Sequence, residues 1–239
     1  MQRLRRSLGE LGIKEPMSVA AWSRVLRETI RRNRVTHGLV YLQVSRGAHP
    51  RDFLFPPAGT LPMVVCLARA VPRARGDAAA SKGIAIKTVP DNRWERCDIK
   101  TVMLLPASLA KQAARAEAAS DAWFVDADGL VTEGASSNAW IVDKDKRLIT
   151  RPAADHGILR GITRTTLIDL LRREGIELVE RPFTVAEATE AREAFLTSAT
   201  NVVMPVVQID GKSIGNGVPG LLTLMLRAAF HDQAEASSP

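Results

Sequence analysis

The spacing of apolar residues changes partway along this chain, and that change limits the folds it can adopt. In the first part the apolar residues recur at helical spacing, as Leu4, Leu8 and Leu11 do. Ser18 then precedes a second helical stripe over residues 19–32, where its side chain is placed to cap the helix. Farther on, short runs rich in β-branched and aromatic residues alternate with turns that contain glycine and proline. Helices followed mainly by strands predict an α+β fold.

The same patterns place the remaining elements and one boundary. A polar stretch over residues 73–82 is predicted to be a loop between a small N-terminal domain, residues 1–72, and a larger domain, residues 73–239. Residues 157–175 are expected to be a strand or loop that leads into a helix, with Ile162 on its core face and Gly175 at its end. We further expect strands over residues 38–45, 62–70, 83–88, 122–125, 138–143, 177–184, 194–198 and 202–209, and helices over residues 108–119, 185–191 and 218–231.

The formal net charge of +7 is concentrated near the N-terminus. Nine arginine and lysine residues stand against three glutamates within residues 1–35. Neither a zinc-finger spacing nor an aromatic RNA-binding signature accompanies this surplus. A solvated helical face is therefore the favoured interpretation, and we expect no nucleic-acid partner.

The cysteines and the apolar runs indicate the compartment. Cys66 and Cys97 have neither the spacing of a zinc site nor the density of a disulfide framework, so we expect no metal and a reducing cytoplasm. The longest apolar run, residues 61–70, is broken by Arg69 and is too short to span a bilayer. The arginine-rich N-terminus does not have the pattern of a secretory signal. We therefore expect no membrane segment and no export.

Three segments place polar groups where a plain core strand would not. Lys100 precedes an apolar run, and a buried lysine is costly unless it is paired or used covalently. Glu133 is followed by small residues that would let a flat ligand approach the backbone. Gly161 and Thr163 stand at a helix start, where free N–H groups can bind an anion. Each segment alone also has an ordinary explanation: a lysine that points to water, a hairpin turn, or a common helix start.

Together and in this order, the three segments resemble the signature of the class IV aminotransferases, the fold-type IV pyridoxal-phosphate (PLP) enzymes. The resemblance is closest to D-amino-acid transaminases and extends from Arg3 through the C-terminal helix. It implies a small N-terminal α/β domain and a larger mixed, β-barrel-like domain with flanking helices. The motifs that carry it are Asp98-Ile99-Lys100 with Leu104-Leu105, Thr132-Glu133-Gly134 with Ser136-Ser137-Asn138, and Leu159 with Gly161-Ile162-Thr163-Arg164.

The resemblance also implies a role for each site residue. Lys100 would form the Schiff base with PLP and, once released, move the proton of the substrate Cα. Glu133 would bond the pyridine nitrogen of PLP and keep it protonated. The other cofactor contacts implied are Arg3, Ile162, Thr163, Ser198 and Ala199 at the phosphate, with Ala199 offering only its N–H, and Leu159 on the ring face.

Substrate choice is implied by a second motif. Arg51 follows a proline, as in D-amino-acid transaminases, and a guanidinium can hold a substrate carboxylate in a bidentate way. This predicts a D-amino acid such as D-alanine as donor and a 2-oxo acid such as 2-oxoglutarate as acceptor. Phe53 departs from the pattern, because the best-known members have a histidine there. A branched-chain aminotransferase and an aminodeoxychorismate lyase are the alternatives within the family.

The resemblance has two further consequences. Relatives carry several tens of residues ahead of the Arg3 motif, so the N-terminal portion of the family fold is expected to be missing here. The family forms homodimers with active sites near the subunit interface, so we expect a two-fold dimer. An inactive truncated relative and a basic nucleic-acid binder are the alternatives that are not enzymes.

Overall fold

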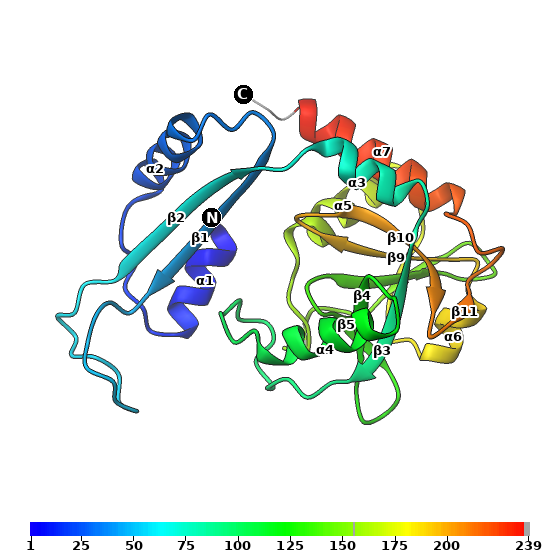
Figure 1. The fold of residues 1–239 in the computed structure, drawn as a ribbon, viewed down its shortest axis with the longest axis horizontal. Coiled ribbons are helices and arrows are strands. Elements are labelled where there is room, and N and C mark those ends of the chain that lie inside the picture. Colours follow the sequence, from blue (N-terminus) through cyan, green and yellow to red (C-terminus); the bar gives the residue numbers. More distant parts are fainter. Residues whose placement is uncertain (155, 237–239) are drawn as a thin grey trace. The chain divides into compact units, whose positions relative to one another are not determined.

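The computed structural model describes residues 1–154 and 156–236. The chain forms two compact units, Met1–Arg75 and Gly76–Pro239 (Figure 1). The division falls within the polar stretch over residues 73–82. The loop predicted there is wrong, because the structure has a helix, α3 (Arg73–Ala80). Half of its residues are alanines, which have the highest helix propensity of any residue.

The first unit combines two helices with a two-stranded sheet. α1 (Gln2–Glu10) and α2 (Val19–Arg32) lie where the helical spacing predicts them. The Ser18 hydroxyl accepts the Ala21 N–H at 3.3 Å, which confirms the expected N-cap. The strands β1 (Gly38–Ser45) and β2 (Met63–Ala70) pair in an antiparallel register without a bulge.

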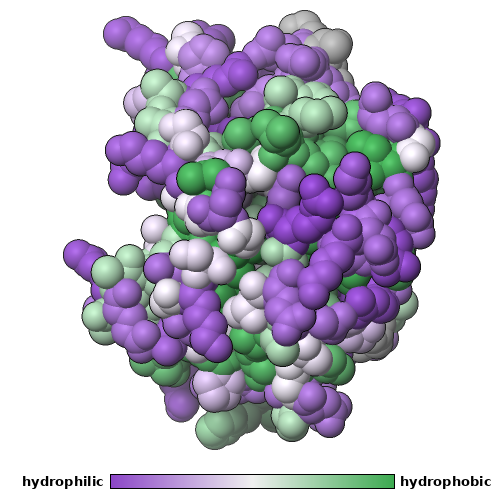
Figure 2. Space-filling view, turned by 90° about the vertical axis from the view of Figure 1, so that its right-hand side faces the viewer, coloured by the Kyte–Doolittle hydropathy of each residue, from purple (hydrophilic) through white to green (hydrophobic). Residues whose placement is uncertain are grey.

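One face of this small sheet is apolar and exposed. Successive side chains of a strand point to opposite faces, so Met63, Val65 and Leu67 of β2 share one face. All three are exposed, as is Tyr41, which lies opposite Leu67 on β1. The side of the molecule drawn in Figure 2 also shows hydrophobic residues reaching the surface in patches between hydrophilic ones.

The second unit is built on a nine-stranded mixed sheet. Its strands follow the order β5-β4-β3-β10-β9-β6-β7-β8, with β11 paired to β10. β3 is parallel to both of its neighbours, β7 is parallel to β8, and the other pairs are antiparallel. The strands are β3 (Ile84–Pro90), β4 (Asp121–Val125), β5 (Val131–Gly134), β6 (Asn138–Val142), β7 (Leu148–Thr150), β8 (Leu178–Glu180), β9 (Glu193–Ser198), β10 (Val202–Ile209) and β11 (Lys212–Ser213).

The two ends of this sheet approach each other. Leu130, just before β5, forms an isolated bridge with Thr184, and the Val131 N–H donates to the Phe183 carbonyl at 2.9 Å. Because β5 and β8 are the two outermost strands, these contacts curl the sheet into the barrel-like form expected. The strand predicted over residues 177–184 is shorter than expected. Thr184 instead caps the next helix in a capping box with Glu187.

Four more helices complete the second unit: α4 (Leu105–Ala116), α5 (Ile162–Arg173), α6 (Val185–Glu190) and α7 (Leu221–Ala236). α4 begins three residues earlier than predicted, since Pro106 occupies its first turn, where no N–H donor is needed. Gly175 follows α5 with φ +66°, as expected of a terminating glycine.

The sheet and its helices bury a core rich in aromatic residues. α5 and α7 cover the sheet through a cluster that includes Trp140 and Phe195, whose stacked rings lie 5.5 Å apart (Figure 1). A second cluster, around Trp123 and Phe183, includes residues of β3, β5, β6 and β10. Among the described residues, no helix is both long and apolar enough to cross a membrane.

Candidate active site

Glu133 is a buried carboxylate in the second unit. It lies on β5, a strand whose four residues are all buried, and only 6% of its surface is exposed. From the sequence alone, a hairpin turn was an equally good explanation of this segment. In the structure, Glu133 lies in a strand of the sheet. A buried charge needs partners, so its neighbours define the site.

Arg93 is the cationic partner of Glu133. Its Nη1 lies 2.5 Å from Glu133 Oε1, and its Nη2 lies 2.7 Å from Asp91 Oδ2. The Thr132 hydroxyl donates to the same Asp91 oxygen at 2.7 Å and also accepts from Arg93. The guanidinium carbon lies 4.5 Å from the centroid of the Phe124 ring, within the range of a cation–π contact. Sequence reasoning missed Arg93 and Asp91.

Asn138 and Leu159 complete the contacts of the carboxylate. The Asn138 side-chain amide donates to Glu133 Oε2 at 3.0 Å and to the Leu159 carbonyl at 2.9 Å. The Leu159 N–H lies 3.2 Å from both Glu133 oxygens. Gly161 leaves room for this arrangement, since a Cβ there would lie 2.2 Å from Asn138 Oδ1. The predicted Glu133 and Leu159 segments are therefore held together.

Burial and ion pairing act on Glu133 in opposite directions. Burial raises the pKa of Glu133 to about 7, and the ion pair with Arg93 and the N–H of Leu159 offset only part of that rise. Burial lowers the pKa of Arg93, but its ion pairs with Asp91 and Glu133 outweigh this and raise it. The pKa of the carboxyl group is therefore close to neutral pH. A second cation beside the group would favour its charged form.

The N-terminus of α5 is a candidate anion site. The helix begins after Gly161, and among the described residues no side-chain cap of its first N–H groups is seen. Its first turn has no acidic residue, and Thr163 in that turn is buried. The free N–H groups and the positive end of the helix dipole favour an anion there. The predicted Ile162 and Thr163 are the first two residues of this helix.

The turn between β9 and β10 carries two more predicted residues. Thr197 pairs with Asn138 across the sheet, so Ser198 and Ala199 follow directly beside the start of β6. The Ser198 hydroxyl accepts the N–H of Asn201 at 3.0 Å, which fixes the turn. Ala199 is exposed, and its predicted N–H contact with the phosphate stays a prediction.

Lys100 lies on the irregular segment 91–104, which joins β3 to α4. The residue is exposed, and the preceding Ile99 is buried. The Asp98 N–H donates to the His156 carbonyl at 3.1 Å, so the Lys100 loop lies beside the segment that leads to Leu159. The second unit therefore contains the candidate amine, the candidate carboxylate and the candidate anion site.

The two other predicted residues, Arg3 and Arg51, lie in the first unit. Arg3 is on α1, one turn before Ser7, whose buried hydroxyl has no hydrogen-bond partner among the described residues. Arg51 is exposed, with its guanidinium carbon 5.5 Å from the centroid of the Phe53 ring. The other candidate residues lie in the second unit, and each unit is described by itself. The roles of Arg3 and Arg51 in the site therefore stay predictions.

The residues of the second unit fit PLP. A buried carboxylate suits the pyridine nitrogen, an uncapped helix N-terminus suits the phosphate, and a lysine on a neighbouring loop suits the aldehyde. Among the described residues, no group of three or more His, Cys, Asp or Glu could hold a metal ion.

Comparison with known proteins bears on the same assignment. The family model for amino-transferase class IV matches residues 1–209. A D-alanine aminotransferase of Bacillus licheniformis is 38% identical over 96% of this chain and 79% of its own length. One from Staphylococcus haemolyticus is 35% identical over 99% of this chain and 82% of its own length. These relatives are thus longer than this chain.

Solved structures show the same fold. A branched-chain amino acid aminotransferase of Escherichia coli superposes with a TM-score of 0.87 at 25% identity, over 97% of this chain and 77% of its own. A Thermus branched-chain enzyme with bound pyridoxamine 5′-phosphate gives a TM-score of 0.88 at 24% identity, over all of this chain and 78% of its own. The chain therefore belongs to the class IV aminotransferase family, and it is a transaminase of the PLP-dependent fold type IV.

Proposed function

We propose that this transaminase moves an amino group between a D-amino acid, such as D-alanine, and a 2-oxo acid, such as 2-oxoglutarate. Lys100 is the proposed Schiff-base lysine. The observation that carries the proposal is the position of Glu133, a buried carboxylate held by Arg93, Asn138 and the Leu159 N–H. The relatives named D-alanine aminotransferases, at 33–38% identity, support the choice of substrate.

Glu133 is the proposed partner of the cofactor ring. When bound, PLP supplies an electron sink that stabilises negative charge at the substrate Cα. In that complex Glu133 would hold a proton at the ring nitrogen, because an anion beside that nitrogen favours its protonated form. Arg93 orients the carboxylate and limits its protonation, since removing a nearby cation would raise the pKa of Glu133 further. Lys100 would carry the proton at the substrate Cα.

The phosphate is assigned to the N-terminus of α5. Ile162 and Thr163 would donate their N–H groups, and Thr163 also its hydroxyl. The turn at Ser198 and Ala199 would add donors from the side of β9. Arg3 would supply the cationic contact, as the family resemblance implies. Leu159 would pack on the ring face.

The substrate carboxylate is assigned to Arg51. A guanidinium offers two parallel N–H donors to a carboxylate, and Arg51 is exposed in the first unit. Phe53, which is 91% exposed, stands where a second polar contact would help. We therefore expect weaker carboxylate binding than a site with both an arginine and a histidine would give, which appears as a raised KM for D-alanine.

The test is a titration of the purified chain with PLP. We expect a visible absorbance band that borohydride abolishes, and a peptide containing Lys100 whose mass rises by the reduced cofactor. D-alanine and L-alanine are then compared as donors with 2-oxoglutarate, and pyruvate is measured. Lys100→Ala is the control: it should bind PLP without covalent attachment. A cofactor fixed at another lysine, or preference for L-alanine, would contradict the proposal.

A branched-chain aminotransferase is the second candidate. The observation that favours it is the match to the E. coli branched-chain enzyme over 97% of this chain. L-Leucine with 2-oxoglutarate distinguishes the two, because a branched-chain enzyme would turn it over faster than D-alanine. Aminodeoxychorismate as substrate tests the lyase alternative in the same assay.

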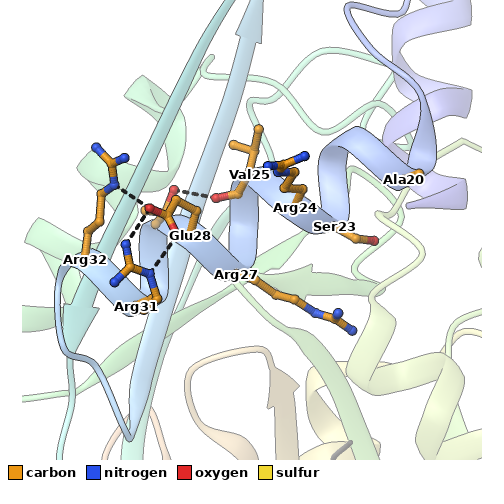
Figure 3. Close-up of a pocket in the computed structure, with 9 residues that line it drawn as sticks. Ala20, Ser23, Arg24, Val25, Arg27, Glu28, Arg31 and Arg32 are labelled. Atoms are coloured by element: carbon orange, nitrogen blue, oxygen red, sulfur yellow. Dashed lines mark hydrogen bonds and ion pairs between the residues drawn. The ribbon is translucent and has the colours of Figure 1, made fainter.

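The basic first unit gives little support to nucleic-acid binding. Figure 3 shows a hollow along α2 that is lined by Ala20, Ser23 and four arginines. Two of these arginines, Arg31 and Arg32, pair with Glu28 at 2.7 Å, which offsets part of the charge. We therefore expect no DNA binding at low salt or at high salt.

We also propose a cytoplasmic homodimer. Residues 102–105 in the second unit are exposed apolar residues, each at 59–69% exposure, and a second copy would bury them. Cys66 and Cys97 are free, as a reducing compartment requires. Light scattering on a sizing column checks the dimer, with a monomer mass as the contrary outcome.

A further inference from the structure

We propose that Asp98 and His156 are positioning residues for Lys100, which fix the loop of the lysine against the segment that holds Glu133. Together with Arg96 they form what we call the Asp98–His156 clasp. This inference rests on the proposed role of Lys100. It concerns how the amine is placed, and it assigns no chemical step to the clasp itself.

The position of Lys100 depends on contacts of its loop. Residues 91–104 form neither helix nor strand, so no ladder of backbone hydrogen bonds holds them. A reacting amine must nevertheless be held to about 0.5 Å of its productive position. Ile99 supplies one anchor, because its side chain is only 5% exposed. Its N–H also donates to the Arg96 carbonyl at 3.2 Å, which closes a tight turn just before Lys100.

Asp98 supplies the second anchor, through both its main chain and its side chain. Its N–H donates to the His156 carbonyl at 3.1 Å, and its carboxylate lies 3.1 Å from His156 Nδ1. Arg96 donates to both oxygens of the carboxylate, with Nε 3.0 Å from Oδ1 and Nη2 3.1 Å from Oδ2. Asp98 is only 5% exposed, so losing these partners would leave a buried charge with fewer contacts.

The segment that begins at His156 also contacts Glu133. Three residues farther along, the Leu159 N–H binds both Glu133 oxygens, and the Leu159 carbonyl accepts from Asn138. The backbone of His156 is left-handed, with φ +61°, a conformation that is uncommon for non-glycine residues. One continuous set of contacts therefore joins the Lys100 loop to Glu133 through residues 156–159.

Three variants test the side-chain contacts of the clasp separately from the backbone conformation of His156. His156→Gly removes the imidazole while glycine accepts the left-handed conformation without strain. His156→Asn is the rescue variant, since asparagine tolerates that conformation and its amide can replace the Nδ1 donor. Asp98→Asn keeps the shape and the backbone N–H but removes the charge.

Asp143→Asn is the matched control. Asp143 also pairs with an arginine, Arg147, at 2.8 Å and accepts backbone N–H groups. It follows the end of β6 opposite to Asn138, in the turn that leads to β7. Its loss should therefore lower stability without altering the Lys100 loop.

Two measurements test the proposal. In the cofactor-free chain, hydrogen exchange at residues 96–101 should become at least several-fold faster in Asp98→Asn and His156→Gly, and stay slow in His156→Asn and Asp143→Asn. In the PLP-loaded chain, the rate at which borohydride-reducible cofactor appears on Lys100 should fall ten- to a hundredfold, on the order expected for a misplaced reacting group, in the first two variants alone.

Unchanged exchange in Asp98→Asn and His156→Gly would overturn the clasp as a restraint. Faster exchange with an unchanged attachment rate would overturn its role in placing Lys100, while the proposed function would stand. If the unsubstituted chain attached PLP at a residue other than Lys100, the proposed function would fail, and the positioning role would fail with it.

Discussion

The guanidinium of Arg93 and the carboxylate of Glu133 lie 2.5 Å apart, although 40 positions separate them along the chain. Glu133 is buried and Arg93 is partly buried, with side-chain exposures of 7% and 13%, and Arg93 also pairs with Asp91. One cation therefore compensates a buried and a partly buried carboxylate. This arrangement holds Glu133 in one orientation on β5.

Arg93→Met should strongly destabilise the second unit. The variant leaves the buried Glu133 and the partly buried Asp91 without their cation, and removing one partner of a buried pair costs about 3–5 kcal/mol. Urea unfolding followed by tryptophan fluorescence measures the loss, because Trp123 and Trp140 are buried in this unit. Arg93→Lys, which keeps the charge but not the fork, should recover part of it. A loss below about 1 kcal/mol in the methionine variant would contradict the role given to the pair.

Glu133→Gln should bind PLP but lose turnover. Glutamine preserves the shape and can still accept from the Leu159 N–H, yet it carries no charge to keep the ring nitrogen protonated. We expect kcat to fall on the order of a hundredfold or more, as for other lost electrostatic contacts in active sites. PLP affinity by absorbance and kcat with D-alanine are the measurements. Turnover within about threefold of the parent chain would argue against Glu133 as the ring partner.

The cofactor-free chain should lose stability between acid and neutral pH because of Glu133. Burial raises the pKa of Glu133 to about 7 from an ordinary value near 4.5, so within this window the folded state binds a proton that the unfolded state lacks. The free energy of unfolding therefore falls as pH rises, by about 2 kcal/mol from this group between about pH 5 and about pH 7.5.

Glu133→Gln supplies the comparison for this pH effect, because glutamine does not titrate. Urea unfolding of both chains at the two pH values isolates the contribution of Glu133 as the difference between them. A difference that stays constant across the interval would show that the carboxyl group is already ionised at pH 5, contrary to the effect expected from its burial.

Gly161→Ala should weaken PLP binding. The added Cβ would lie 2.2 Å from Asn138 Oδ1, so Asn138 must shift and release its bonds to Glu133 and Leu159. We expect an increase in Kd of about tenfold, equivalent to about 1.4 kcal/mol. Gly59→Ala is the control, because a Cβ at Gly59 meets nothing within 4 Å. Equal affinities of the two variants would show that the contact between Gly161 and Asn138 does not shape the site.

The sequence predicted those parts of the protein whose signals are local. The helical spacing and the Ser18 cap placed α1 and α2, and the runs of β-branched and aromatic residues placed β1, β2, β9 and β10. Three short strands, β5, β7 and β11, were missed because two to four residues carry no measurable period. α3 was missed because its polar residues resemble those of a loop.

The site residues also divide into those with a local sequence signal and those without one. Lys100, Glu133 and Thr163 belong to motifs that can be recognised as contiguous residues, so the sequence alone determined them as candidates and with them the family. Arg93 and His156 lie in irregular segments, and they acquire meaning only from partners that are distant in sequence, Glu133 and Asp98. Which cation meets a buried carboxylate depends on how strands and loops pack in three dimensions, because desolvation and ion pairing act through space. That choice was decided by the tertiary structure alone.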